Sequence, residues 1–155
     1  MSDWNLLWTS KHSKNYTFEG LHENQRINIF PRMEEITRKD RLCKNINRMQ
    51  RRYGKEAFDF FPTTYVLPEG YAEFQEHFIR LREKDQRKNM WILKPANSSQ
   101  GKGIRIVDDI KDINIEETSV IQRYITNPLL INGHKFDLRT YVLITSYEPL
   151  KIYIF

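Results

Sequence analysis

The spacing of hydrophobic residues predicts two helices in the first half of the chain. An amphipathic helix is predicted over residues 38–52 and ends at Gly54. Thr37 is placed to cap its start, with Asp40 three residues on, in a pattern close to a capping box. A second helix starts at Pro68-Glu69-Gly70 and continues to residue 81. The apolar faces of the two helices are Leu42, Ile46 and Met49, and Tyr71, Phe74, Phe78 and Leu81.

Short runs of Ile, Val, Tyr and Phe replace the helical spacing after residue 90, and they predict β-strands. Asn132-Gly133 is a turn dipeptide, and residues 108–113 form a short polar connection. The charged stretch 82–89 is predicted to be a surface loop between subdomains at 1–88 and 89–155. The predicted strands cover residues 5–8, 64–67, 91–94, 104–107, 120–124, 139–145 and 151–155.

Composition narrows the class of protein. The 155 residues are 39% hydrophobic and 13% aromatic, so the chain is expected to fold. Cys43 is the only cysteine, which excludes an internal disulfide and argues against a zinc site. The N-terminus has no cationic start followed by an apolar run, and no apolar stretch of about 18 residues exists. Neither a signal peptide nor a membrane span is therefore predicted.

Positive charge is concentrated in residues 32–55, which hold nine Lys and Arg residues against three acidic ones. The whole chain has a net charge of +5, so the remainder is close to neutral. Such a basic segment attracts an acidic partner, whether nucleic acid, a membrane surface or an acidic protein tail. The alternative is an ordinary solvated face of an amphipathic helix.

The stretch 90–103 runs from an apolar strand to a polar loop that contains glycine. Lys94 ends the predicted strand, and Lys102 lies between Gly101 and Gly103. Glycine permits close approach of backbone N–H groups to an anion, and the lysines add charge. This order indicates a phosphate site, although the loop matches neither a Walker A nor a dinucleotide-binding pattern. The alternative is a hairpin without a ligand.

Two later segments could complete a nucleotide site. Gln122 and Ile125 end a predicted strand, where an amide and an apolar group suit the edge of a purine. The segment 135–139 alternates, so in a strand Lys135, Asp137 and Arg139 would share one face. That face could form the floor of a polar site, or it could be plain solvated surface.

Four separated motifs resemble the tubulin–tyrosine ligase-like family, and its polyglutamylase branch in particular. Residues 32–42 and 4–8 also resemble the family's N-terminal region, so the likeness covers nearly the whole chain. The motifs are Trp91-Ile92-Leu93-Lys94-Pro95, Ser99-Gln100-Gly101-Lys102-Gly103-Ile104, Gln122-Arg123-Tyr124-Ile125 followed by Pro128-Leu129-Leu130-Ile131, and Lys135-Phe136-Asp137-Leu138-Arg139 followed by Tyr141-Val142-Leu143.

The resemblance implies an α+β, ATP-grasp-like fold with an N-terminal subdomain and a central antiparallel-sheet subdomain. It implies an ATP-dependent ligase that adds glutamate to glutamate side chains of tubulin tails through an acylphosphate. Lys94 and Arg139 would be catalytic, and Arg48, Arg51 and Arg52 are expected to attract the acidic tail. The implied ATP-binding residues are Lys94, Gln100, Gly101, Gln122, Arg123, Tyr124, Ile125, Lys135, Phe136 and Asp137.

One departure from the family pattern concerns magnesium. The resemblance places the Mg²⁺ ligands beyond Phe155, and only Glu148 follows Asp137 as a carboxylate. The chain is therefore expected to lack the C-terminal part and to hold no metal site itself. Two alternatives remain, a truncated, non-catalytic tubulin-binding protein and a tubulin glycylase. The expected location is the cytoplasm and cytoskeleton, including the cilium or basal body, with no nucleic acid or membrane partner.

Overall fold

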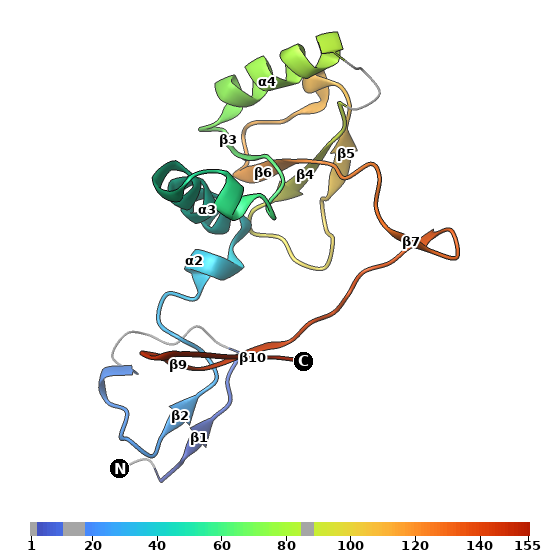
Figure 1. Cartoon of the computed structure of the whole chain (residues 1–155). Coiled ribbons are helices and arrows are strands. Elements are labelled where there is room, and N and C mark those ends of the chain that lie inside the picture. The colour runs from blue at the N-terminus through green and yellow to red at the C-terminus, as the bar shows by residue number, and fades with distance from the viewer. Residues whose placement is uncertain (1–2, 11–17, 85–88) are drawn as a thin grey trace. The chain divides into compact units, whose positions relative to one another are not determined.

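A computed structural model gives the fold and describes residues 3–10, 18–84 and 89–155 (Figure 1). The chain divides into two compact units, Met1–Tyr124 and Ile125–Phe155. The first unit contains a four-stranded antiparallel sheet with the strand order β3-β6-β4-β5. Its strands are β3 (Thr64–Leu67), β4 (Trp91–Pro95), β5 (Arg105–Val107) and β6 (Ser119–Arg123). All four lie where the sequence predicted strands, to within one residue at each end.

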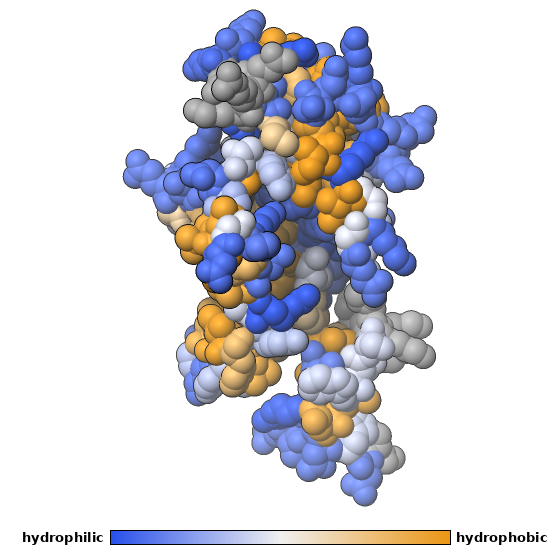
Figure 2. Space-filling model, turned by 90° about the vertical axis from the view of Figure 1, so that its right-hand side faces the viewer, coloured by the Kyte–Doolittle hydropathy of each residue, from blue (hydrophilic) through white to orange (hydrophobic). Residues whose placement is uncertain are grey.

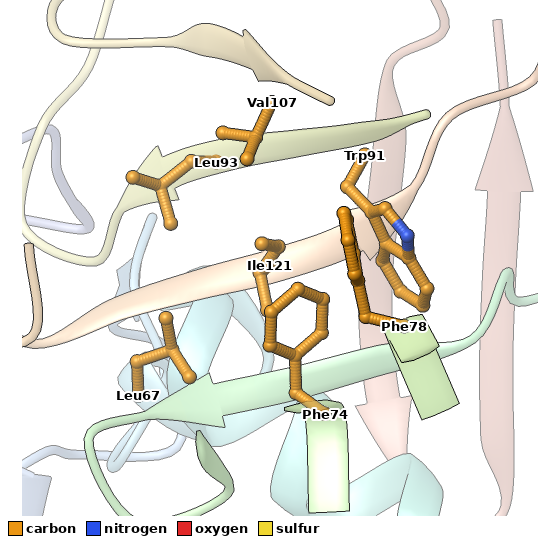
Figure 3. Packing of buried hydrophobic residues seen from close by; sticks show 7 residues of the cluster. All are labelled: Leu67, Phe74, Phe78, Trp91, Leu93, Val107 and Ile121. Atoms are coloured by element: carbon orange, nitrogen blue, oxygen red, sulfur yellow. The ribbon is translucent and has the colours of Figure 1, made fainter. Parts of the chain in front are cut away.

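Helix α4 (Tyr71–Lys84) packs on one face of this sheet and closes the main hydrophobic core (Figure 3). Phe74 and Phe78 come from the helix and are fully buried, as the predicted apolar face requires. The rings of Phe74 and Trp91 meet edge to face, with centroids 5.0 Å apart. The indole N–H of Trp91 donates to the Asn89 side-chain oxygen at 2.8 Å, so its polar group is satisfied within the core.

Helix α3 (Lys39–Tyr53) packs on the other face, over β3 and β6. Successive residues of a strand point to opposite faces. Val66 and Val120 therefore face away from the α4 core and form a second, smaller cluster with Cys43 of α3. The Cys43 thiol donates to the Thr64 carbonyl oxygen at 3.6 Å. The same strands thus contribute to two cores.

The start of α3 differs from the prediction, whereas its end agrees. The helix ends at Tyr53, and Gly54 has a φ of 90°. The predicted Thr37 cap is wrong, because Thr37 belongs to a short helix, α2 (Glu34–Thr37), and its hydroxyl donates to the Met33 carbonyl at 3.0 Å. Arg38 is the residue that precedes α3, and its side chain makes no capping bond. The hydrophobic pattern did not predict α2, since a single helical turn has no periodicity to detect.

The remaining elements of the first unit are short. Strands β1 (Leu6–Leu7) and β2 (Arg26–Ile27) pair in parallel, so the strand expected at 5–8 is confirmed in its central two residues. The connection predicted at 108–113 contains a 3-10 turn, η3 (Ile110–Asp112), and a second turn, η1 (Glu56–Phe58), follows α3.

The second unit consists of two hairpins. Strands β7 (Leu130–Ile131) and β8 (His134–Lys135) pair across Asn132-Gly133, whose φ angles of 52° and 77° confirm the predicted turn. Strands β9 (Val142–Tyr147) and β10 (Leu150–Ile154) form the other hairpin. The strand expected from residue 139 begins only at Val142, and β8 ends at Lys135, so the structure assigns no strand to residues 136–141. A strand requires a partner for its backbone groups, and of these residues only Tyr141 exchanges backbone hydrogen bonds with another described residue, Phe155, at 2.9 Å.

The predicted boundary at residue 88 coincides with residues 85–88, which lie outside the described residues. Strand β3 precedes this point, so the sheet draws on both expected subdomains, and the division itself stays a prediction. No described helix has the length and apolarity needed to cross a bilayer. Hydrophilic side chains cover much of the surface seen in Figure 2, with hydrophobic groups between them.

Candidate functional site

Lys94 lies on the α3 face of the sheet, at the end of β4. Its neighbours Trp91 and Leu93 point into the α4 core, so the alternation of the strand directs Lys94 to the other side. Trp91 and Leu93 of the apolar run thus build the core on one face, and Lys94 projects from the opposite face. The sequence predicted a cation at this strand end, and the structure bears that placement out.

A chain of hydrogen bonds crosses three strands on this face. The Lys94 ammonium donates to Gln122 Oε1 at 2.8 Å, and Gln122 Nε2 donates to Thr64 Oγ1 at 2.9 Å. The Thr64 hydroxyl in turn donates to the Pro62 carbonyl at 2.7 Å. Each group therefore has a defined donor or acceptor role, and the chain fixes the direction of the Lys94 side chain.

Lys39, the first residue of α3, provides a second ammonium at this place. It donates to the carbonyl oxygens of Pro95 at 3.1 Å and Ser98 at 2.6 Å. Burial, and then the nearby Lys39 charge, lower the pKa of the Lys94 amino group. Two ammonium groups that repel one another favour an anion between them, because the anion relieves both the repulsion and the desolvation.

The loop that follows Lys94 has the backbone conformations expected for an anion-binding turn. Gln100, Gly101 and Gly103 have φ angles of 57°, 75° and 71°. A Cβ on Gly103 would lie 2.9 Å from Pro95 Cγ, so a glycine is required for the loop to close on its own root. Gln100 and Gly101 are exposed, and backbone bonds from Lys102 to Ser99 and from Ile104 to Gly101 shape the turn.

A row of paired residues extends the site toward the edge of the sheet. Gln122 pairs with Ile92, and Ile92 pairs with Ile106, so all three share one face. Ile106 is 45% exposed, whereas Val120 under α3 is 4% exposed. The β4–β5 part of this face is therefore an open apolar surface beside Lys94. Such a surface suits the flat face of a heterocyclic base.

The other predicted residues of the first unit lie elsewhere. The Arg123 guanidinium stacks over the Trp91 ring at 5.7 Å, on the α4 face and opposite Lys94. Tyr124 contributes its backbone N–H to the Met90 carbonyl at 3.0 Å, which holds the end of β6 beside β4. Gln122 accepts the Lys94 hydrogen bond through its side-chain oxygen, and its expected place at the edge of a purine stays a prediction.

Five predicted site residues belong to the second unit, which is described on its own. All of them are exposed, and only Lys135 lies in a strand. The structure thus brings together Lys94 and Gln122 from the predicted set, and the placement of the second-unit residues at a common site stays a prediction. These residues are Ile125, Lys135, Phe136, Asp137 and Arg139.

Ion pairs divide the basic segment into two halves. Near its start, Arg38 binds Asp40 at 2.9 Å, and Arg41 binds Glu35 at 3.0 Å. Hydrogen bonds from Arg38, outweighing burial, lower the pKa of the Asp40 carboxyl. The cations toward the end of the segment differ, because they form no ion pair with any residue in the described ranges. They are Arg48, Arg51 and Arg52 in the C-terminal half of α3, and Lys55 just after Gly54.

Lys39, Thr64 and Ile106 were not singled out by the sequence. The position of Lys39 could have indicated a role, since a cation at a helix N-terminus is unfavourable with respect to the helix dipole unless another group compensates it. Thr64 and Ile106 carried none, because their roles depend on strand register. Across residues 3–10, 18–84 and 89–155, no cluster of three His, Cys, Asp or Glu side chains could hold a metal ion.

Comparison with known proteins identifies the family. A model of the tubulin-tyrosine ligase family matches residues 18–155. The chain belongs to the tubulin-tyrosine ligase family. The predicted resemblance is therefore confirmed, and the mixed architecture of helices and antiparallel sheet is that of an α+β domain of this family.

Relatives within the tubulin-tyrosine ligase family match almost the whole chain. Tubulin polyglutamylase TTLL5 from Homo sapiens is 47% identical over 154 residues, which cover 99% of this chain and 12% of that protein. Probable tubulin polyglutamylase TTLL2 from Mus musculus is 40% identical over 156 residues, covering 100% of this chain and 29% of the relative. Tubulin monoglutamylase TTLL4 from Homo sapiens is 40% identical, with 99% and 12% covered. The chain thus spans less than a third of the length of these relatives.

Proposed function

We propose that this chain takes part in an ATP-dependent tubulin ligase that adds glutamate to glutamate side chains of tubulin tails. The observation that carries the proposal is the pair Lys94 and Lys39, held by Gln122 and by the root of the Gly-containing loop. The names of the relatives, tubulin polyglutamylases and a monoglutamylase, support the choice of glutamate and of tubulin.

ATP fits the described residues at its phosphates and at its base. Lys94 and Lys39 would hold phosphate oxygens, with Gln100 and Gly101 in the loop beside them. Ile92 and Ile106 provide the apolar surface for the adenine ring. The segment 122–125 would border the base. Lys135, Phe136 and Asp137 would contact the nucleotide from the second unit, in the ATP-grasp arrangement that we also propose for the complete site.

The role of these residues in the reaction is electrostatic. In such a ligase a glutamate carboxylate attacks the terminal phosphorus of ATP and ADP leaves, and the incoming amine then displaces phosphate from the acylphosphate. Lys94, oriented by Gln122, would balance the negative charge that grows on the transferred phosphoryl group. Arg139 is proposed to act on the phosphate or substrate side. Across the described ranges no group of three His, Cys, Asp or Glu side chains is placed to hold a metal ion, so the proposed roles are those of this chain's cations and amide.

The tubulin tail would lie against the unpaired half of the basic segment. Arg48, Arg51 and Arg52 have no ion pair among the residues that the structure describes, so their charge is available to an external partner. A tubulin partner also supports a location on the cytoskeleton, with the cilium or basal body as the proposed site. Neutralising these three arginines should weaken tubulin binding and reduce its salt dependence. Unchanged binding would reject this surface.

The deciding experiment measures ATP-dependent transfer of labelled glutamate to tubulin by the intact protein. Lys94→Ala should abolish incorporation, whereas Lys111→Ala, a charge change on the exposed turn η3, should leave it intact. Labelled glycine in place of glutamate tests the glycylase alternative. Binding of tubulin without any ATP-dependent incorporation would favour a non-catalytic tubulin-binding protein, which the basic face of α3 alone could support.

A further inference from the structure

A cavity of about 330 Å³ lies beside the C-terminal half of α3, bounded by the residues that flank η1, by β3 and by the first turn of α4. Its volume is about ten times the share of a water molecule in the liquid, roughly 30 Å³, so it has room for one side chain. Phe61 and Pro62 give it apolar walls, and Asn47 contributes an amide. Lys94 itself does not line this cavity, but Thr64 and Pro62 do, so the cavity adjoins the end of the hydrogen-bond chain that orients Lys94.

Two cations line the cavity, Arg51 and Lys55. Neither forms an ion pair with any residue of the described chain, in contrast to Arg38, Arg41 and Lys44 nearer the helix start. Both residues are exposed, so solvent screens each charge, but two cations without an ion pair on one wall still attract an anion. The arrangement favours an acidic group inside the cavity.

Asp59 and Glu73 also line the cavity, and they limit what it can accept. Two carboxylates would repel a second anion, which argues against a strongly charged ligand such as a polyphosphate. A peptide fits better, since its backbone N–H groups can donate to these carboxylates while one acidic side chain reaches the cations. The apolar walls suit the two methylene groups of a glutamate side chain.

We propose that this cavity binds one glutamate side chain of an acidic peptide, with Arg51 and Lys55 on its carboxylate and with Phe61 and Pro62 against its methylene groups. The proposal deepens the proposed tail-binding role of α3 and rests on it. It adds a defined anchor point to an otherwise diffuse attraction. Arg48 and Arg52, which are exposed and do not line the cavity, would then steer the peptide, and the cavity would fix its position.

The test is binding of a fluorescent Gly/Ser peptide that carries glutamates to the full chain, measured by anisotropy without ATP. Lys55→Gln should weaken binding by about tenfold, the loss expected for a charge-assisted contact. The matched change Lys111→Gln, on η3, should alter it less than about twofold. A peptide with aspartates in place of glutamates has the same charge but is one methylene shorter at each acid, and it should bind more weakly.

Arg51→Lys separates the cavity from general attraction, because the charge stays and only the planar fork is lost. Weaker binding at constant charge supports the cavity. The cavity proposal would be overturned if Arg51→Lys binds the peptide as well as the unchanged protein does and if Lys55→Gln and Lys111→Gln have equal effects. Melting temperatures of the variants show whether a loss reflects unfolding, and Lys55, outside the helix, provides the second variant.

The same assay distinguishes the proposal from the proposed function. Binding should persist in Lys94→Ala, which is expected to have lost ATP-dependent incorporation. If glutamate transfer is absent in the intact protein and the cavity still selects glutamate over aspartate, the ligase assignment fails and the peptide site stands. If transfer occurs but the cavity variants bind and react normally, the cavity proposal alone fails.

Discussion

The two faces of the four-stranded sheet differ in what their residues do, although they come from the same strands. On the α4 face, Trp91, Leu93 and Ile121 are buried in a continuous apolar core. On the α3 face, Lys94 and Gln122 alternate with those residues and are linked by a hydrogen bond. Strand alternation thus places stability and ligand chemistry one residue apart.

This difference means that neighbouring residues should respond to mutation in different ways. Changes to the α4-face residues should alter the free energy of unfolding, and changes to Lys94 and Gln122 on the α3 face should alter ATP binding.

Phe74→Ala should give the largest loss of stability, about 3–5 kcal/mol, because it removes a fully buried ring and leaves a cavity beside Trp91. Chemical denaturation of the chain measures the free energy of unfolding. Tyr71→Ala, at a partly buried position of the same helix, should cost less. Equal losses at the two positions would contradict the assignment of Phe74 to the centre of the core.

Lys94→Ala should remove the thermal stabilisation that ATP provides, which is about 2.7 kcal/mol when ATP is present at 100 times its dissociation constant. The melting temperature without ATP should change little, since the lost hydrogen bond to Gln122 is offset by relief of the desolvation that lowers the Lys94 pKa. Scanning calorimetry with and without ATP measures both effects. Persistence of the ATP effect would show that Lys94 does not contact the nucleotide.

Thr64→Val should have a smaller effect, weakening ATP binding by roughly tenfold through the loss of one hydrogen bond. The change keeps the shape of the side chain but removes the acceptor for Gln122 Nε2, so Lys94 is held less firmly. Titration calorimetry measures the affinity, and Thr63→Val next to it serves as a control. ATP affinity equal to that of the unchanged protein would mean that the hydrogen-bond chain does not orient Lys94.

The smallest expected effect concerns Cys43, whose thiol is buried between α3 and the sheet. Its reactivity should show that this part of the α3 face is closed to solvent, with little effect on the free energy of unfolding. Burial raises the pKa of its thiol to about 11, two units above the ordinary value of 9.0. At pH 8 the thiolate fraction in the folded chain should therefore be about a hundredfold below that of the unfolded chain. Iodoacetamide labelling, followed by mass spectrometry, should be correspondingly slow and should accelerate in denaturant.

The sign of the linked pH effect follows from the same shift. The stability that the neutral Cys43 thiol contributes is fully present below pH 9 and is lost as the pH rises toward 11, because the unfolded thiol ionises first. Fast labelling of the folded protein at pH 8 would contradict the burial of Cys43.

Much of the fold followed from the sequence, because periodicity and strand composition are local properties. The helix over 38–52, the helix after Gly70 and the four strands of the sheet were predicted close to their observed bounds. Helix α2 and the unassigned segment 136–140 were not, since the first is too short for periodicity and the second alternates without being assigned to a strand.

The candidate site was only partly predictable, for a different reason. Lys94 was visible as a cation at the end of an apolar run. The hydrogen bond from Gln122 to Thr64 depends on which strands are neighbours and on their register. Strand order and register cannot be read from the local pattern of a single sequence. Arg123 follows Gln122 in the same strand, β6, so strand alternation places its side chain on the α4 face, opposite Gln122 and Lys94.

The anchoring of the loop root by Lys39 has a consequence for the entropy of nucleotide binding. Ordering a free residue costs about 1–2 kcal/mol of backbone entropy. Lys39 already holds Pro95 and Ser98, and Gly103 is packed against Pro95, so part of this cost is met during folding. The ligand then has to order only the turn around Gln100. Preorganisation of this kind allows a short, exposed loop to contribute to the affinity for the nucleotide. A freely moving loop of the same sequence would lose that contribution to its own ordering entropy.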